Sequence, residues 1–254
     1  MSPSIWTRCA GSSRLRRLEG RAWRAVEAQH VVSTSKLADS PAEQEALERM
    51  IDSVKPPPPG DREFSGLHYL LTTPFRYPPL AHGSRFATRF ERALWYGSRE
   101  LRSVFAEVAY YRLLFLEGTT ARLGRLEVDL SLFRVPLRTR RGIDLTRPPF
   151  AAYRGRISSP SAYDDSQRLG REMREAGVEG FLYRSARDRE GGTHVALFTP
   201  RAFATRRPSA AQTWHCAASR ERVELTRKDA LDRAAFVFPR GEFEIRGKLP
   251  RPAL

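Results

Sequence analysis

Hydrophobic residues near the amino terminus recur at intervals that suit an α-helix. In residues 12–32, Leu15, Leu18, Trp23 and Val26 follow one another at steps of three to five residues. This is the spacing of one buried helix face. The pattern therefore predicts a first helix.

A second helix is predicted over residues 40–54. Ser40 is a suitable N-cap, with a proline one residue later and a glutamate three residues later, as in a capping box. The prolines at 56–59 cannot continue a helix and form a stiff connector. We therefore expect an N-terminal helical extension over residues 1–60.

Beyond residue 60 the apolar runs become short and are interrupted by Pro and Gly, as is typical of strands and loops. A helix is predicted after Ser98, which can act as its cap, and Gly118 suits its carboxyl end. A further helix is predicted at 166–176. Strands are predicted at 125–137, 180–185 and 194–200, a strand-to-loop segment at 68–80, and weaker strands within 214–225 and 243–249.

The order of these elements predicts the α+β class. We expect three units along the chain. Residues 1–60 form the helical extension, residues 61–205 form the central domain, and residues 206–254 form a C-terminal extension that packs on the core.

The positive charge of the chain raises nucleic-acid binding as a candidate function. The 44 basic and 29 acidic residues give a net charge of +15, and clustered Lys and Arg would indicate a nucleic-acid partner. The excess is spread out, because basic and acidic residues number 9 and 7 over 1–60, 24 and 16 over 61–205, and 11 and 6 over 206–254. We expect no direct nucleic-acid binding, although a non-enzymatic, basic nucleic-acid-binding or scaffold protein stays open as an alternative.

Cysteine and histidine usage argues against a metal site. Cys9 and Cys216 stand far apart without a CxxC motif, and the five histidines are scattered. The first residues lack the apolar run of a signal peptide, and no stretch approaches the roughly 20 apolar residues that span a bilayer. We expect a cytoplasmic protein without membrane contact.

Glu107 is a candidate for chemistry because its predicted helix offers it no basic neighbour. The residues three and four positions away are Ser103, Val104, Tyr110 and Tyr111, and helical ion pairs form at these spacings. In a chain so rich in arginine, we expect the partner of Glu107 to come from elsewhere in the fold or from a ligand.

An ordered set of short motifs resembles the RES family, which is named for its Arg, Glu and Ser. The motifs GSRF, ALWYGSRE, FAEVAYYR and GFLYRSARDREGGTHVALF follow one another within residues 65–205. The three residues correspond to Arg85, Glu107 and Ser185. The segment after Arg85 has less glycine than the family pattern, and His194 stands where such domains often carry asparagine.

The resemblance implies a fold similar to ADP-ribosyltransferases, with a split β-core and a cleft for NAD. Family members are toxins of bacterial toxin-antitoxin modules that break down NAD, in some members by phosphorolysis, and another member ADP-ribosylates a protein target. We therefore expect the toxin of a type II module that depletes NAD, with phosphorolysis as the first choice of reaction and hydrolysis as the second. NAD is then a substrate, phosphate is the co-substrate of phosphorolysis, and no cofactor is needed. A mono-ADP-ribosyltransferase acting on a protein target is the alternative activity. An Xre-type helix-turn-helix antitoxin is the implied partner, and a homo-oligomer is compatible with the resemblance.

Within this resemblance, Arg85, Glu107 and Ser185 are the expected catalytic residues. Cleavage of the nicotinamide–ribose bond develops positive charge on the sugar, and the Glu107 carboxylate would stabilise that charge. Arginines would bind phosphate oxygens, tyrosine rings would contact nicotinamide, and Ser185 would orient Glu107 or the ribose. The expected NAD-binding residues are Arg76, Tyr77 and Tyr96.

Overall fold

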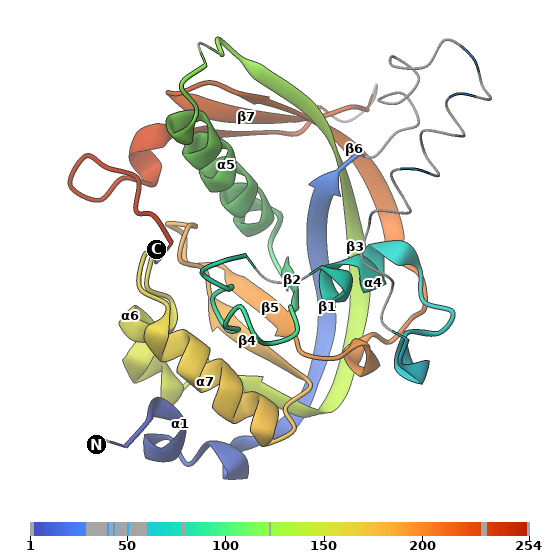
Figure 1. Ribbon diagram of the computed structural model, residues 1–254, viewed down its shortest axis with the longest axis vertical. Helices are drawn as coiled ribbons and strands as arrows, with labels where there is room; N and C mark the ends of the chain where they lie inside the picture. Colours follow the sequence, from blue (N-terminus) through green and yellow to red (C-terminus); the bar gives the residue numbers. More distant parts are fainter. Residues whose placement is uncertain are drawn as a thin grey trace.

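A 19-residue strand, β3 (Leu126–Asp144), organises a mixed sheet of eight strands (Figure 1). It pairs antiparallel with β1 (Arg16–Glu27) and β6 (Ser209–Ala218), and parallel with β4 (Gly180–Arg184) at its carboxyl end. The computed structural model describes residues 3–28, 40, 43, 50, 60–77, 80–121, 123–229 and 233–252.

Strand pairing closes on itself within this sheet. The strand order is β1-β2-β5-β4-β3-β6-β7-β8, and β1 also pairs with β3. Strands β1, β2, β5, β4 and β3 therefore form a closed circuit of hydrogen-bonded neighbours, which β6, β7 and β8 extend. The strands not yet introduced are β2 (Trp95–Ser98), β5 (Thr193–Leu197), β7 (Arg222–Arg227) and β8 (Ala235–Pro239).

Strand β3 is buried on both faces, which explains its imperfect alternation in the sequence. Leu132 packs in the apolar cluster beneath α5 (Leu101–Gly118), whereas Phe133 and Val135 belong to a second cluster shared with β1, β2 and β5. The register with β6 shifts between Leu132 and Arg134. Successive side chains of a strand point to opposite faces, so apolar residues at consecutive positions can each enter one of the two clusters.

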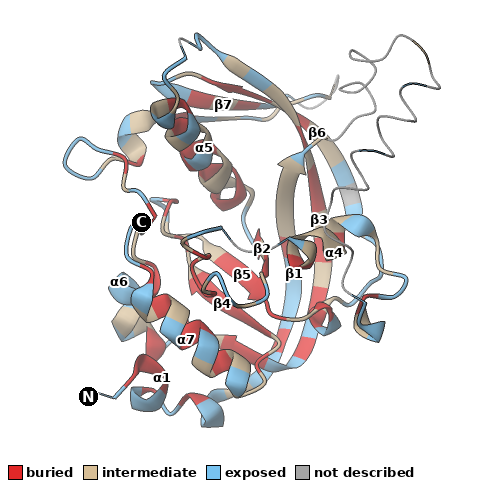
Figure 2. Cartoon of the chain, viewed as in Figure 1, coloured by how far each residue is buried: buried red, intermediate tan, exposed pale blue. Residues whose placement is uncertain are grey.

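Helices cover different parts of the sheet. Phe105, Ala109 and Leu113 on α5 pack against residues of β6, β7 and β8. Helices α7 (Asp164–Glu175) and α1 (Ile5–Arg8) pack against β4 and β5, and Figure 2 shows buried residues concentrated on β4, β5 and the inward side of α7. This arrangement of helices and strands confirms the α+β class. The remaining α-helices of the described residues are α4 (Tyr69–Arg76) and α6 (Arg154–Ile157).

The predicted helix over residues 12–32 is wrong for its described part, because Arg16–Glu27 forms β1. Leu18 and Ala22 are buried on one face of this strand. Gly20 between them has a φ of 142°, far from the helical region. Nearly the whole strand pairs with β3, and this long-range pairing outweighs the local helical spacing.

The strand-to-loop prediction at 68–80 is also wrong, because α4 occupies Tyr69–Arg76. His68 caps this helix through its ring Nδ1. Leu71 and Phe75 lie one turn apart and are both buried, so tertiary packing stabilises a helix that the neighbouring prolines obscure in the sequence.

Three smaller predictions need correction. Ser98 does not cap α5, because it ends β2, and Glu100 takes the N-cap position without a side-chain hydrogen bond. The predicted strand over 243–249 is absent among the described residues there, and the last strand, β8, lies upstream. The predicted helices after residue 98 and at 166–176 and the strands at 125–137, 180–185 and 194–200 are confirmed, although β3 extends to Asp144. The single strand predicted over 214–225 is wrong, because this segment contains the end of β6, a turn and most of β7.

The predicted helix over residues 40–54 lies almost entirely outside the described residues. The division into three units stays a prediction, and the described parts of the first and third units contribute β1 and β6–β8 to the same sheet. No helix in the described ranges combines the length and apolar character required to cross a bilayer.

Candidate active site

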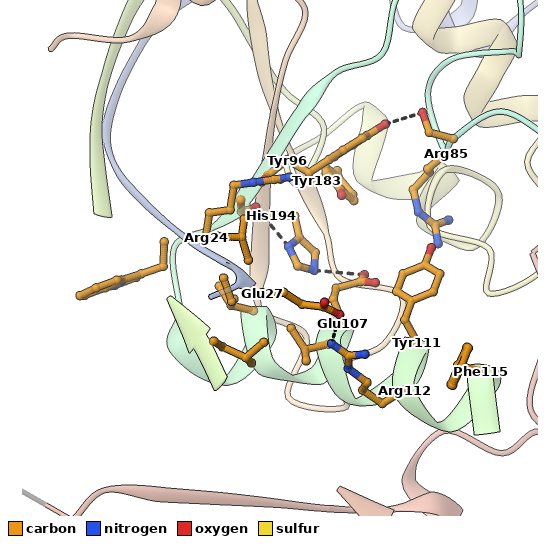
Figure 3. A pocket seen from close by; sticks show the side chains of 18 of the residues that line it. Arg24, Glu27, Arg85, Tyr96, Glu107, Tyr111, Arg112, Phe115, Tyr183 and His194 are labelled. Atoms are coloured by element: carbon orange, nitrogen blue, oxygen red, sulfur yellow. Dashed lines mark hydrogen bonds and ion pairs between the residues drawn. The ribbon is translucent and has the colours of Figure 1, made fainter. Parts of the chain in front are cut away.

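A cleft of about 500 Å³ opens between α5, β1 and the β2–β5 pair (Figure 3). Pockets of ~300–1,000 Å³ are typical of sites for small molecules. This cleft is rich in arginine and aromatic side chains. Its charged and aromatic lining residues are Trp23, Arg24, Glu27, Arg85, Tyr96, Glu107, Tyr111, Arg112, Phe115, Tyr163, Tyr183 and His194.

Glu107 and His194 face each other on the inner wall of the cleft. The Glu107 Oε1 atom, from the middle of α5, lies 3.5 Å from the Nε2 atom of His194 on β5. The His194 side chain is 4% exposed, whereas that of Glu107 is 28% exposed. Figure 3 shows the Glu107 carboxylate between the His194 ring and Tyr111. Arg85 lies on the side of the carboxylate that is away from His194.

The ring of His194 is held in a defined orientation. Its Nδ1 lies 3.2 Å from the carbonyl oxygen of Gly97, and because a carbonyl only accepts, Nδ1 donates in this contact. Burial has the largest influence on the imidazole and holds its pKa below the usual 6.5, while Glu107 acts in the opposite direction. The glutamate thus has a protein neighbour, and this neighbour is mainly neutral at neutral pH.

Arg85 lines the cleft on the side opposite His194. It is 8% exposed, its Nη1 donates to the carbonyl of Ser159 at 2.6 Å, and its guanidinium lies 4.7 Å from the centre of the Tyr163 ring. A cation over an aromatic face is electrostatically favourable. These contacts hold the guanidinium at the cleft before any ligand arrives.

Tyr96 forms part of an aromatic wall. Its hydroxyl lies 3.0 Å from Ser84 Oγ, and its ring meets that of Tyr183 edge-on with centres 6.5 Å apart. Burial raises the pKa of Tyr96 to about 12, so the phenol stays neutral at ordinary pH. Tyr183 also stacks on His194, which continues the wall to the glutamate.

Arg24 is a cleft residue that spacing in the sequence does not reveal. Its Nη1 donates to the carbonyl of Tyr96 at 2.5 Å, and its buried Nε has no hydrogen-bond partner among the described residues. Burial lowers its pKa to about 10, which still leaves it charged at neutral pH. Trp23 and Arg24 lie in β1, a segment whose hydrophobic spacing predicts a helix in place of the strand.

The mouth of the cleft is apolar on the α5 side. Tyr111 and Phe115, one helical turn apart, are 49% and 55% exposed and both line the cleft. Arg112 between them pairs with Glu27 of β1 across the opening. Aromatic faces beside a charged pair suit a flat ring that carries polar groups at its edge.

Ser185 lies outside the residues that line the cleft. It follows β4, is 4% exposed, and its Oγ accepts hydrogen bonds from the backbone amides of Arg187 and Asp188 at 3.1 and 3.0 Å. The side chain therefore shapes the β4–β5 loop. Asp188 in that loop accepts from Ser103 Oγ at 2.5 Å and so ties the loop to α5.

Arg76 and Tyr77 are not brought to the cleft. Arg76 is the last residue of α4 and Tyr77, 40% exposed, is its C-cap. Neither lines the cleft that contains Glu107. The structure therefore gathers Arg85, Tyr96 and Glu107 in one site and leaves the other three predicted residues outside its lining.

The arrangement suits an anionic ligand that forms a cation as it reacts. Arg24, Arg85 and Arg112 supply donors that match phosphate oxygens. The Glu107 carboxylate can stabilise developing positive charge, and the aromatic wall can hold a planar ring. No group of three or more His, Cys, Asp or Glu side chains in the described part of the chain is arranged to hold a metal ion.

The chain was compared with models of protein families and with curated proteins, and only the first comparison gave a match. A sequence model for the family described as RES domain matches residues 62–219, which is more than half of the chain. This region includes α5, the β4–β5 pair and the residues Arg85, Glu107 and His194. No curated protein matches the chain in sequence.

Proposed function

The chain belongs to the RES domain family, and on that premise we propose that it is an enzyme that cleaves the bond between nicotinamide and ribose in NAD. The single observation that carries the proposal is the position of Glu107. Its carboxylate lies in an arginine-lined cleft, 3.5 Å from a buried imidazole and without a basic lysine or arginine partner among the described residues.

The chemistry requires such a carboxylate. When the C–N bond breaks, its electron pair leaves with nicotinamide, and the ribose carbon becomes an oxocarbenium-like cation. A fixed negative charge beside the ribose lowers the energy of that transition state, most strongly where water is scarce. We assign this role to Glu107, which would also accept hydrogen bonds from the ribose hydroxyls.

The rest of the cleft suits the other parts of NAD. Arg85 and Arg24 would bind the pyrophosphate, since each presents guanidinium donors to the cleft while a carbonyl contact fixes its position. Tyr96 and Tyr183 would contact the nicotinamide ring. These assignments move the predicted phosphate contacts from Arg76 to Arg24, and no ligand role is assigned to Tyr77 or Ser185.

Phosphorolysis is our first choice of reaction. An oxygen of inorganic phosphate attacks the ribose carbon and forms ADP-ribose phosphate, with nicotinamide as the leaving group. In hydrolysis, water attacks instead, forms ADP-ribose and releases one proton. The abundance of arginine in the cleft favours phosphate as the nucleophile, because a second anion can then be held beside the first.

Incubation of the purified chain with NAD, with and without phosphate, tests the proposal. We expect nicotinamide release that depends on phosphate, together with ADP-ribose phosphate as the second product. ADP-ribose in both samples would show hydrolysis, and label from NAD on an added protein would show ADP-ribosyl transfer. Unchanged NAD in all samples would overturn the proposed function.

We further propose that the enzyme is the toxin of a toxin-antitoxin pair in the cytoplasm, with an Xre-type helix-turn-helix antitoxin as partner. The net charge of +15 favours an acidic segment in the partner, and the exposed Tyr111 and Phe115 offer an apolar contact at the cleft mouth. Co-expression with the antitoxin encoded beside this chain is expected to abolish the loss of cellular NAD and to restore the growth of the cells that produce it. Unaltered NAD loss in the complex would contradict blocking of the cleft.

A further inference from the structure

The contact between His194 and Glu107 has no proton between its two facing atoms when the histidine ring is neutral. The buried Nε2 of His194 has no hydrogen-bond partner among the described residues, although Oε1 of Glu107 lies 3.5 Å away. Because Nδ1 donates to Gly97, a neutral ring carries its lone pair on Nε2. The lone pair then faces an ionised carboxylate, and two acceptors repel each other.

Protonation of Nε2 reverses this relationship. The imidazolium donates to Oε1 and forms an ion pair whose ring is 4% exposed and whose carboxylate is 28% exposed, so the two charges interact more strongly than at an open surface. Two effects then oppose NAD cleavage. The Glu107 charge is compensated by the ring, and a second positive charge lies close to the ribose cation that the reaction must form.

We propose that neutral His194 is a positioning residue, which turns the uncompensated Glu107 carboxylate toward the substrate, and that protonation of its Nε2 captures this carboxylate and stops turnover. The proposal rests on the proposed function, because it concerns the residue that stabilises the ribose cation. His194 itself stays behind Glu107, 4% exposed, and acts through it.

The surroundings of His194 decide which form of the ring predominates. Burial and the positive charge of Arg85 oppose protonation, while the negative charges and the carbonyl favour it, and burial is the largest influence. The resulting pKa lies below 6.5, so the neutral, active form predominates at pH 7.5. The groups that face the ring are Glu107 on α5, Gly97 on β2, Asp188 and Arg85 from loops, and Tyr183 on β4, stacked with ring centres 5.3 Å apart.

A pH profile of nicotinamide release tests this role. For the parent protein, kcat should fall about tenfold per pH unit below a midpoint under 6.5, while KM for NAD changes little. In His194→Asn, the amide oxygen can face Glu107 as the lone pair of the neutral ring does, and the side chain does not titrate. The acid limb at the parent midpoint should therefore be lost in this variant. An acid limb at the parent midpoint in this variant would overturn the proposal.

Truncation separates positioning from simple folding. In His194→Ala, kcat should fall about tenfold or more at pH 7.5 with KM nearly unchanged, because an orienting contact contributes in the transition state and not in binding. His194→Asn should recover most of this loss. Equal kcat in parent and His194→Ala, at equal thermal stability, would contradict positioning.

His215 provides a matched control. It lies on β6 away from the cleft, and its ring nitrogens also face carboxylates, with Asp129 at 3.2 Å and Glu127 at 3.8 Å. His215→Asn should leave both kcat and the acid limb unchanged. If His215→Asn moves the acid limb as far as His194→Asn does, the limb does not report on the cleft and the proposal fails.

The pairing can be measured without any activity. NMR titration of the His194 ring should show a lower midpoint in Glu107→Gln than in the parent, because the carboxylate raises the pKa of the ring. An unchanged midpoint would overturn the pairing even in an active enzyme. Absence of nicotinamide release by the parent would instead overturn the proposed function, so the two failures are distinguishable.

Discussion

The Nη1 of Arg24 donates to the backbone carbonyl of Tyr96 at 2.5 Å, which ties β1 to β2 at the edge of the cleft. The two residues lie on strands that pair through Trp23 and Ser98. The contact therefore fixes the position of both an arginine and a tyrosine of the candidate site. It also leaves the Nε of Arg24 buried without a partner among the described residues.

Replacement of Arg24 by glutamine is expected to weaken NAD binding. A charged hydrogen bond contributes about 1.5–3 kcal/mol, so KM for NAD should rise about 10- to 100-fold, with a smaller effect on kcat. Arg21→Gln on an exposed position of the same strand should leave KM unchanged. Initial rates over a range of NAD concentrations give KM for each variant. Equal KM values for the two variants would show that Arg24 does not bind NAD.

Replacement of Glu107 by glutamine is expected to stop turnover while preserving the fold. The amide keeps the shape but lacks the charge that faces the ribose cation, so kcat should fall about 10²- to 10³-fold while the Kd for NAD stays within a few-fold. Glu117→Gln, on the same helix and paired with Arg240 at 3.4 Å, is the control. Thermal unfolding, NAD binding and nicotinamide release are measured on each preparation.

A different outcome would assign Glu107 a structural role. If Glu107→Gln unfolds at a clearly lower temperature yet releases nicotinamide at the parent rate, the carboxylate serves packing and not catalysis. The Glu117 control separates this result from a general effect of losing one charge on α5.

The approach of the β4–β5 loop to α5 predicts a sensitive glycine. A Cβ on Gly192 would lie 1.8 Å from Ser103 Oγ and 2.9 Å from Asp188 Oδ2, where these two side chains share a buried hydrogen bond. Gly192→Ala should therefore cost about 1–3 kcal/mol of unfolding free energy. Gly155→Ala has open space around its Cβ and should be neutral or slightly stabilising. Denaturant unfolding of both variants checks the difference.

Alkaline pH is expected to destabilise the protein through Tyr96. Its pKa is about 12 in the fold against 10.0 for a free tyrosine, so its contribution is complete below pH 10 and is lost as pH rises toward 12. The loss is at most about 2–3 kcal/mol. Unfolding of Tyr96→Phe should therefore depend less on pH over this range. Because this variant also loses the contact with Ser84, the slopes of the two curves are compared, and equal slopes would contradict the prediction.

Elements whose residues decide their own structure are predicted well from the sequence. Helix α5 has a continuous helical pattern that ends at a glycine, and β4 and β5 are short apolar runs that flank a turn. Strand β1 is different, because its pairing partner lies more than a hundred residues away. No local window contains that information, and the spacing of Leu15, Leu18, Trp23 and Val26 predicts a helix instead.

The candidate site divides in the same way. Arg85, Tyr96 and Glu107 lie within one region that resembles the family, so their order identifies them. Arg24 comes from the misread strand, and His194 becomes a partner of Glu107 only when α5 and β5 are folded together. Arg76 and Tyr77 are of residue types that suit phosphate and ring contacts, yet both lie at the end of α4 and outside the lining of the cleft.

The closed circuit of strands also determines when the site can exist during synthesis. Strand β1 emerges from the ribosome first, but its neighbours β2 and β3 follow much later, and β5 completes the circuit only near residue 197. Contacts of such long sequence separation form slowly, and translation adds about 5–20 residues per second. A nascent chain therefore has no assembled cleft for many seconds, and any activity of the site begins only after most of the chain has been synthesised.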